Sequence, residues 1–216
     1  MSRKIWFPAR AKLNDPEDLE LKLVEDVDAK VYRQFLLKKA DQESWPRKHL
    51  KYNLKKGFTP KGDLTSEAKR KIASSQAVLQ KHFDGLGILS LSDKKNDSVL
   101  WERYGDKGNG VCIVFEMELS EYLLRVEYES PRPQPKLSVL LLSADREQEL
   151  IKVLRTKTTK WSEESEWRYF VRNGNTEFSF FGKIAAIRLG KKMLDAKRQA
   201  VTQWVAASGQ PIGIED

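Results

Sequence analysis

The sequence predicts an α+β fold in which a mostly antiparallel sheet carries flanking helices and a basic helical insertion at about residues 30–83. Up to residue 83 the apolar residues recur at helical spacing, whereas beyond it they alternate or form short runs bounded by glycine. The 216 residues, of which 40% are hydrophobic and 10% aromatic, are expected to form one domain over 1–216 with a real core.

The first part of the chain is expected to hold one strand, one turn and three helices. A strand over 5–7 ends at Pro8, and Asn14-Asp15-Pro16 has the composition of a turn. Asp63 is expected to cap the third helix, because a short polar side chain there precedes an apolar periodic stretch. The expected helices cover 30–40, 46–56 and 63–83.

The rest of the chain is expected to alternate short strands with helices. The apolar run 137–142 has the length of a buried strand, and 110–116 is expected to be a buried strand in which Cys112 is an inert small hydrophobe. The turn Asn173-Gly174-Asn175 predicts a hairpin that pairs 166–172 with 176–181. The remaining expected elements are strands at 87–92, 124–128, 184–189 and 212–214 and helices at 97–104, 144–157 and 192–206.

Composition excludes several classes of chemistry. The only histidines are His49 and His82, and Cys112 is the only cysteine, so neither a zinc site nor a disulfide framework is expected. The sequence contains no Walker-type or dinucleotide glycine motif. No apolar run approaches a membrane span and no leader is recognisable, so we expect a cytoplasmic protein without membrane contact.

The positive charge is concentrated in the predicted helical block. Residues 38–82 hold twelve basic and four acidic side chains, so this stretch accounts for the whole formal charge of +8. Such a block predicts an acidic partner, either nucleic acid or an acidic protein, and a solvated helical face explains it equally well. Lys48, Lys51 and Lys55 fall on one helical face and are the expected nucleic-acid contacts.

Several short motifs follow one another in a familiar order. This order resembles the bacterial family catalogued as domain of unknown function 2971, whose members run from an FNDP turn through an LMWSHYAxxHxGVCIxF segment to a KxxxWxxExEWR segment. Family members usually carry a further segment and a helix before the NDP turn, whereas this chain starts almost at the turn, and Glu102-Arg103-Tyr104 stands where the family has SHY. We therefore expect an N-terminally short, divergent member. The matching residues are Trp6-Phe7-Pro8, Asn14-Asp15-Pro16, Leu100-Trp101, Tyr104-Gly105-Asp106, Gly110-Val111-Cys112-Ile113 and Lys157, Trp161, Glu164, Glu166, Trp167 and Arg168.

The spacing Glu164-x-Glu166-x-Arg168 is the strongest candidate for catalytic chemistry. In an extended strand alternate residues point the same way, so both carboxylates and the guanidinium are expected on one face. Mutual repulsion is expected to raise the pKa of one carboxylate. The family resemblance implies a distant likeness to ADP-ribosyltransferases, in which Glu166 is the catalytic carboxylate and Glu164 its partner. A surface ladder of charges on an exposed strand explains the same spacing.

The remaining candidate residues are assigned to a bound NAD. Arg168 is expected to bind its pyrophosphate, and Trp101 with Tyr104 to stack against a ring, although such an aromatic pair also fits a core. Asn14 is a further candidate ligand contact, and an Asx turn explains it equally well. No metal is expected.

Two functions therefore stay open. The first is an NAD-dependent, ADP-ribosyltransferase-like enzyme in the phage-defence or toxin setting that the resemblance implies. The second is a non-enzymatic nucleic-acid-binding module, and a subunit that only supports a partner toxin or nuclease is a third interpretation.

Overall fold

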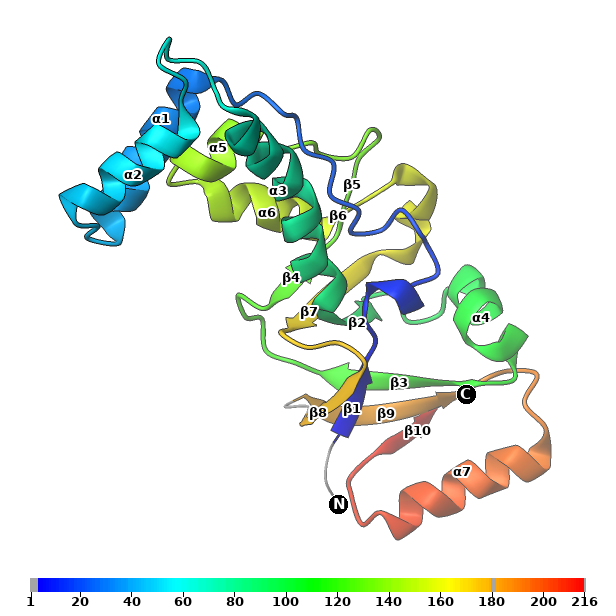
Figure 1. Cartoon of the computed structure of the whole chain (residues 1–216). Coiled ribbons are helices and arrows are strands. Elements are labelled where there is room, and N and C mark those ends of the chain that lie inside the picture. The colour runs from blue at the N-terminus through cyan, green and yellow to red at the C-terminus, as the bar shows by residue number, and fades with distance from the viewer. Residues whose placement is uncertain (1–3, 180–181, 216) are drawn as a thin grey trace.

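A computed structural model describes residues 4–179 and 182–215 of the chain. Helices and mainly antiparallel strands are combined, so the predicted α+β class is confirmed. The elements run from an arm of two helices at one end, through a central sheet, to a C-terminal sheet and helix at the other end (Figure 1).

The helical end is built as the sequence indicates. Tyr32, Leu36 and Ala40 recur every four residues and are buried, while Asp28 caps its helix by accepting a hydrogen bond from the Val31 amide at 2.8 Å. A core forms where Tyr32 and Leu36 meet Phe58, Ile72 and neighbouring apolar residues. The helices of this end are α1 (Ala29–Gln42), α2 (Arg47–Gly57), α3 (Ser66–Gly85), α5 (Leu137–Leu142) and α6 (Arg146–Arg155).

Two local predictions in this half are wrong. Thr65, and not Asp63, caps α3 by accepting from the Ala68 amide at 3.2 Å. The apolar run that was expected to be a strand forms α5, because Leu137 and Leu140 are buried one helical turn apart. A six-residue apolar run fits either element, and here its packing against α1 and α6 selects the helix.

The central part holds two sheets. One has the strand order β2-β7-β4 and is antiparallel, and the other pairs β5 with β6 in parallel. The expected strand over 124–128 is thus divided between two sheets, because Leu124 and Arg125 pair with β7 whereas Glu127 and Tyr128 pair with β6. The strands are β2 (Gly87–Ser92), β4 (Leu123–Arg125), β5 (Glu127–Tyr128), β6 (Thr156–Lys157) and β7 (Glu166–Val171), and α4 (Ser98–Tyr104) follows β2.

The predicted hairpin across Asn173-Gly174-Asn175 does not form. β8 (Thr176–Ser179) pairs with β1 (Lys4–Phe7) and not with β7. The turn is held by distant partners, because the Asn175 amide donates to the Phe7 carbonyl at 2.7 Å and the Asn175 side chain accepts from the Ala9 amide. The end of the expected strand, residues 180–181, lies outside the described residues.

The C-terminal sheet has the order β10-β9-β3, with β10 parallel to β9. Helix α7 (Asp195–Ala207) packs through Val205 against Ile187 and Leu189 of β9. The expectation that β3 is buried is wrong, because Val111 and Ile113 are 40% and 45% exposed and Cys112 is half-buried. The strands are β3 (Val111–Glu116), β9 (Lys183–Leu189) and β10 (Gly213–Glu215).

Candidate functional site

Five charged side chains are buried together in the central part of the molecule. We call Asp18, Lys157, Glu164, Glu166 and Arg168 the ionic cluster. Each is at most 4% exposed, and hydrogen bonds join them in a line from Glu164 through Lys157, Glu166 and Arg168 to Asp18. Because buried charges are costly unless paired, this line is a strong constraint on how the surrounding segments pack.

Three of the five side chains of the cluster are positioned by β-strands. Glu166 and Arg168 lie two residues apart on β7, and Lys157 ends the short strand β6. Asp18 comes from the N-terminal segment, where Asp15 forms an Asx turn by accepting from the Glu17 amide at 3.2 Å. The expected Asx turn therefore belongs to Asp15 and not to Asn14.

Glu164 reaches the cluster by a different route from the one that its spacing suggests. It ends the 3-10 helix η3 (Thr159–Glu164), and Ser165 after it has a left-handed backbone with φ of 47°. This turn, and not strand alternation, directs the Glu164 carboxylate toward Lys157 at 2.6 Å. The interpretation of Glu164-x-Glu166-x-Arg168 as an exposed ladder is wrong, since all three side chains are buried.

Arg168 has no N–H donor to spare for a ligand. Its Nε and Nη2 donate to the two Glu166 oxygens at 2.9 and 3.0 Å, and Nη1 and Nη2 donate to the Asp18 oxygens at 3.0 and 2.5 Å. Nη1 also donates to the Leu154 carbonyl at 3.1 Å, so five bonds occupy the five donors of a guanidinium. The expectation that Arg168 binds a pyrophosphate is corrected accordingly: the side chain holds two carboxylates in place.

The pairing within the cluster favours the charged forms of Glu166 and Lys157. Burial raises the pKa of Glu166, but attraction and hydrogen bonds from Arg168, with a further contribution from Lys157, outweigh burial and hold that pKa below its ordinary value. For Lys157 burial lowers the pKa, but the attraction of Glu166 and Glu164 outweighs burial and raises the pKa above its ordinary value. The expected rise through carboxylate repulsion does not occur at Glu166, because cations lie between the carboxylates.

One end of the cluster reaches the surface through Tyr104. The Tyr104 hydroxyl donates to Glu164 Oε1 at 2.6 Å and accepts from Asn14 Nδ2 at 2.6 Å. Asn14 is exposed and Tyr104 is 56% exposed, so solvent reaches this end of the line. Burial of the hydroxyl and its bond to Glu164 raise the pKa of Tyr104. Asn14, Tyr104, Glu164 and Glu166 are therefore brought together as one connected set.

Trp161 lines the same end with cations around its indole ring. Arg103, Lys157 and Lys160 lie 5.2, 4.7 and 5.7 Å from the ring centroid, and Arg103 also lies 3.6 Å from Glu164. Trp161 Nε1 and Thr158 Oγ1 are buried atoms that have no hydrogen-bond partner in the described part of the chain. A buried polar atom that has no partner in the protein is available to a water molecule, an ion or a ligand.

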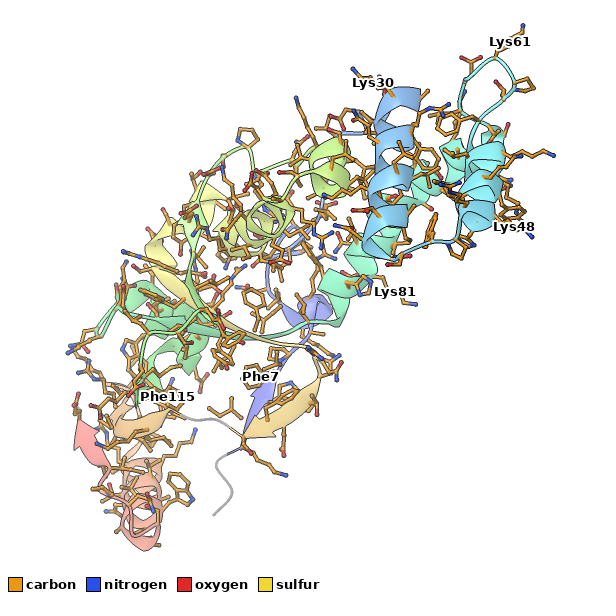
Figure 2. The ribbon with its side chains drawn as sticks, turned by 90° about the vertical axis from the view of Figure 1, so that its left-hand side faces the viewer. Phe7, Lys30, Lys48, Lys61, Lys81 and Phe115 are labelled. Carbon is orange, nitrogen blue, oxygen red and sulfur yellow. The ribbon has the colours of Figure 1, made fainter. Side chains whose placement is uncertain are left out.

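Trp101 and the basic triad lie apart from this set. Trp101 packs over Gly105, where an added Cβ would clash with its ring, so its expected role in stacking a ligand is not supported by its packing. Lys48, Lys51 and Lys55 are exposed on α2, in the distant helical arm shown in Figure 2.

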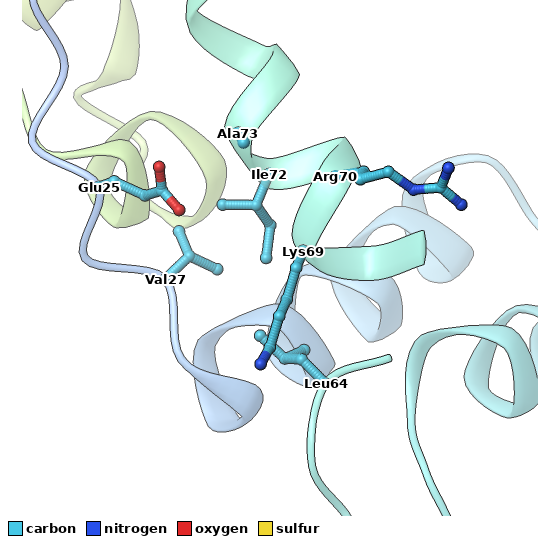
Figure 3. A pocket seen from close by; sticks show the side chains of 7 residues that line it. All are labelled: Glu25, Val27, Leu64, Lys69, Arg70, Ile72 and Ala73. Atoms are coloured by element: carbon cyan, nitrogen blue, oxygen red, sulfur yellow. The ribbon is translucent and has the colours of Figure 1, made fainter. Parts of the chain in front are cut away.

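Two grooves lie along α3, away from the cluster. A groove of about 420 Å³ is lined by Glu25, Val27, Leu64, Ile72 and residues beside them (Figure 3). A second groove of about 380 Å³ continues along α3 past Gln76. None of the site residues expected from the sequence lines either groove. The lining of the grooves is mostly apolar or surface polar and brings no reactive groups together. The ionic cluster is therefore the better candidate for a catalytic site.

Neither a metal-binding group nor a membrane-spanning helix is found among the described residues. Among residues 4–179 and 182–215, no group of three or more histidine, cysteine, aspartate or glutamate side chains is arranged to hold a metal ion. In the ionic cluster the carboxylates alternate with cations, which already satisfy them. The described helices include none that is long and apolar enough to cross a membrane.

Comparison with known proteins gives one match. A family model described as "Protein of unknown function (DUF2971)" matches residues 100–169. The matched segment contains Tyr104, Lys157, Glu164, Glu166 and Arg168, and it leaves out Asn14, Asp18 and the helical arm. No curated protein and no solved structure matches the chain.

Sequence reasoning missed two members of the cluster. Asp18 lies 150 residues from Arg168, and no local pattern links the two. The sequence marks Lys157 only as part of the family resemblance, whereas in the structure its ammonium group bonds to Glu164 and Glu166. The sequence signal for the cluster was the close succession of basic and acidic side chains between residues 157 and 168.

Proposed function

We propose that this chain is an NAD-consuming, ADP-ribosyltransferase-like enzyme whose site is the Tyr104–Glu164 end of the ionic cluster. The observation that carries the proposal is the hydrogen bond from Tyr104 to Glu164, because it joins a buried carboxylate to a solvent-exposed aromatic residue. The distant likeness to ADP-ribosyltransferases that the family resemblance implies supports the same class.

The chemistry of NAD cleavage needs a fixed negative charge. The bond between C1′ of the ribose and the nicotinamide nitrogen breaks with its electron pair on nicotinamide, while an acceptor bonds to C1′ and loses a proton. A carboxylate held in low dielectric stabilises the positive charge that develops on the ribose. Glu164 is suited to this role, because its Oε1 faces Tyr104 while Lys157 fixes Oε2.

The roles of the other residues follow from their contacts. Glu166, expected as the catalytic carboxylate, instead positions Lys157 and thereby Glu164, since Arg168 occupies both of its oxygens. Arg103 takes the pyrophosphate role expected of Arg168, because it is 36% exposed and lies beside Glu164 and Trp161. Trp161 offers a face and an unpaired Nε1 to a ligand.

The test compares glutamine substitutions at two adjacent glutamates, Glu164 and Glu163. Purified wild-type protein is incubated with NAD, and released nicotinamide is measured by chromatography. Glu164→Gln removes the charge beside Tyr104, so release should fall at least 100-fold, in line with the loss of one group that stabilises transition-state charge. Glu163→Gln is the matched control, since Glu163 is 59% exposed and should leave release unchanged.

A second measurement separates binding from turnover. NAD should quench tryptophan fluorescence through Trp161, and Arg103→Gln should weaken that response while Glu164→Gln retains it. Expression of the wild type in bacteria should slow growth if the chain is a toxin, and Glu164→Gln should relieve the effect. Absence of both nicotinamide release and any fluorescence response to NAD would overturn the proposal.

A further inference from the structure

We propose that the outward face of α2 is a docking surface for the sugar-phosphate backbone of a nucleic acid. This surface lies on the helical arm, away from the ionic cluster and outside the segment that the family model matches. The inference therefore does not depend on the proposed enzymatic function.

Four of the five cations of α2 gather on one face. At about 100° per residue, Arg47, Lys51, Lys55 and Lys48 fall within roughly 100° of one another around the helix axis. Leu54, which packs into the core of the arm, lies outside this arc. The sequence of α2 contains no acidic residue, and the four cations are all exposed.

These cations are free, unlike their neighbours in the arm. Lys39 pairs with Glu43 at 3.7 Å and Lys71 pairs with Glu67 at 3.0 Å. By contrast, no carboxylate of the described residues lies within 4.0 Å of Lys48, Lys51 or Lys55. A charge that no internal partner neutralises remains available to an external anion.

Figure 2 shows how far this positive surface extends. Lys48 points away from the body of the protein on α2, and Lys61 extends from the loop at the tip of the arm. Lys30, at the start of α1, points outward at the same end of the molecule. The arm therefore presents an exposed, convex, cationic tip.

A nucleic acid fits this surface better than an acidic protein does. Along the helix axis, Lys51 lies about 4.5 Å beyond Lys48, and Lys55 lies about 6 Å beyond Lys51. A duplex carries one charge per ~1.7 Å of its axis, so several phosphates face these lysines in any register. Tyr52 borders the cationic arc and is 55% exposed, with Lys56 5.0 Å from its ring centroid. An exposed tyrosine among lysines is typical of surfaces on which bases of single strands stack. Because lysine offers a point charge, weak sequence preference is expected.

The experiment uses the full chain and two triple variants of equal charge. Lys48→Gln, Lys51→Gln and Lys55→Gln are combined in one protein. Its control combines Lys191→Gln, Lys192→Gln and Lys197→Gln, which are exposed residues near α7 at the opposite end of the molecule. Fluorescence anisotropy then measures the Kd for duplex DNA, single-stranded DNA and single-stranded RNA from about 50 to 200 mM salt.

The α2 variant should bind roughly 100-fold more weakly at about 0.1 M salt, and the slope of log K against log salt should flatten by about two to three units. The control should keep the wild-type slope. If the triple variant does not fold, Lys51→Gln alone should flatten the slope by about one unit. Tyr52→Ala should weaken binding to single strands and leave duplex binding unchanged.

Three results would each overturn the proposal. The first is no binding of the wild type to any of the three nucleic acids at about 50 mM salt. The second is equal weakening in both triple variants, because net charge and not the α2 face would then explain binding. The third is equally effective competition by polyglutamate of matched charge, which would indicate an acidic protein partner.

Discussion

Replacing Lys157 with methionine is the most demanding test of the ionic cluster. The Lys157 ammonium lies 2.6 Å from Glu164 Oε2 and 3.2 Å from Glu166 Oε2, and all three side chains are at most 4% exposed. At an effective dielectric constant of ~20 these distances correspond to about 6 and 5 kcal/mol of attraction. The cost of desolvating the ammonium offsets much of this attraction, so breaking such a pair typically costs about 3–5 kcal/mol.

We therefore expect Lys157→Met to lower the free energy of unfolding by about 3–5 kcal/mol at pH 8. For a chain of this length the same loss lowers Tm by about 6–20 °C. Urea denaturation followed by tryptophan fluorescence measures the change. Lys152→Met is the matched control, because Lys152 lies 3.7 Å from Glu129 and both side chains are more than 40% exposed, so its loss should be about 1 kcal/mol or less.

The pH dependence distinguishes an electrostatic loss from a packing loss. In the wild type the pKa of Glu166 is depressed, so its contribution to stability is present above the unfolded pKa of about 4.3 and is lost as the pH falls through the folded value. In the variant Glu164 and Glu166 lose the Lys157 ammonium, and Glu166 keeps its bonds to Arg168, so the buried carboxylates are less well compensated. Their penalty should therefore shrink from pH 8 to about pH 5.5 as they take up protons. A loss equal to that of Lys152→Met, or one that is the same at both pH values, would refute the reasoning.

Three other predictions concern single positions. Gly105→Ala should lower the free energy of unfolding by about 1–3 kcal/mol in urea denaturation, because the added Cβ collides with the Trp101 ring; Gly85→Ala, which has open space around it, should not lower it. Burial raises the pKa of Cys112, so a thiol reagent should label the native protein more slowly than the unfolded chain at pH 7, and equal rates would contradict this. Ile113→Thr should change the free energy of unfolding by about 0.5 kcal/mol or less, because Ile113 is 45% exposed, and a larger loss would show that something covers β3.

The helices of the arm could be predicted because their signals are local. Apolar spacing places Tyr32 and Leu36 on one face of α1, and the structure buries both residues. Strand pairing could not be predicted in the same way. Asn173-Gly174-Asn175 satisfies the local requirements of a hairpin, yet Asn175 bonds to Phe7 and Ala9, more than 160 residues away, and these long-range bonds place β8 beside β1.

The candidate site was only partly predictable for the same reason. The sequence identified the carboxylates of Glu164 and Glu166, but the left-handed backbone of Ser165 brings them together. A serine at that position does not predict a left-handed conformation. The neighbouring cations hold both carboxylates in place and lower the pKa of Glu166, and Asp18 completes the line from the other end of the chain. A pattern of spacings therefore located the acidic residues, whereas burial and pairing decided what each of them can do.

The charge balance of the cluster ties the structure to the proposed chemistry. Three carboxylates face two cations, and Arg168 is shared by Asp18 and Glu166 at the inner end. Glu164 lies at the outer end, where Tyr104 reaches solvent, and it shares the Lys157 ammonium with Glu166. Arg103 lies 3.6 Å from Glu164, and Arg103 and Lys160 both lie over the Trp161 ring at this end. A positively charged nicotinamide ring entering beside Tyr104 would meet the Glu164 carboxylate, and the pyrophosphate of the same NAD would meet Arg103. The cationic arc of α2 holds no carboxylate, so it offers nothing to a nicotinamide ring, and NAD should not compete with a nucleic acid for α2.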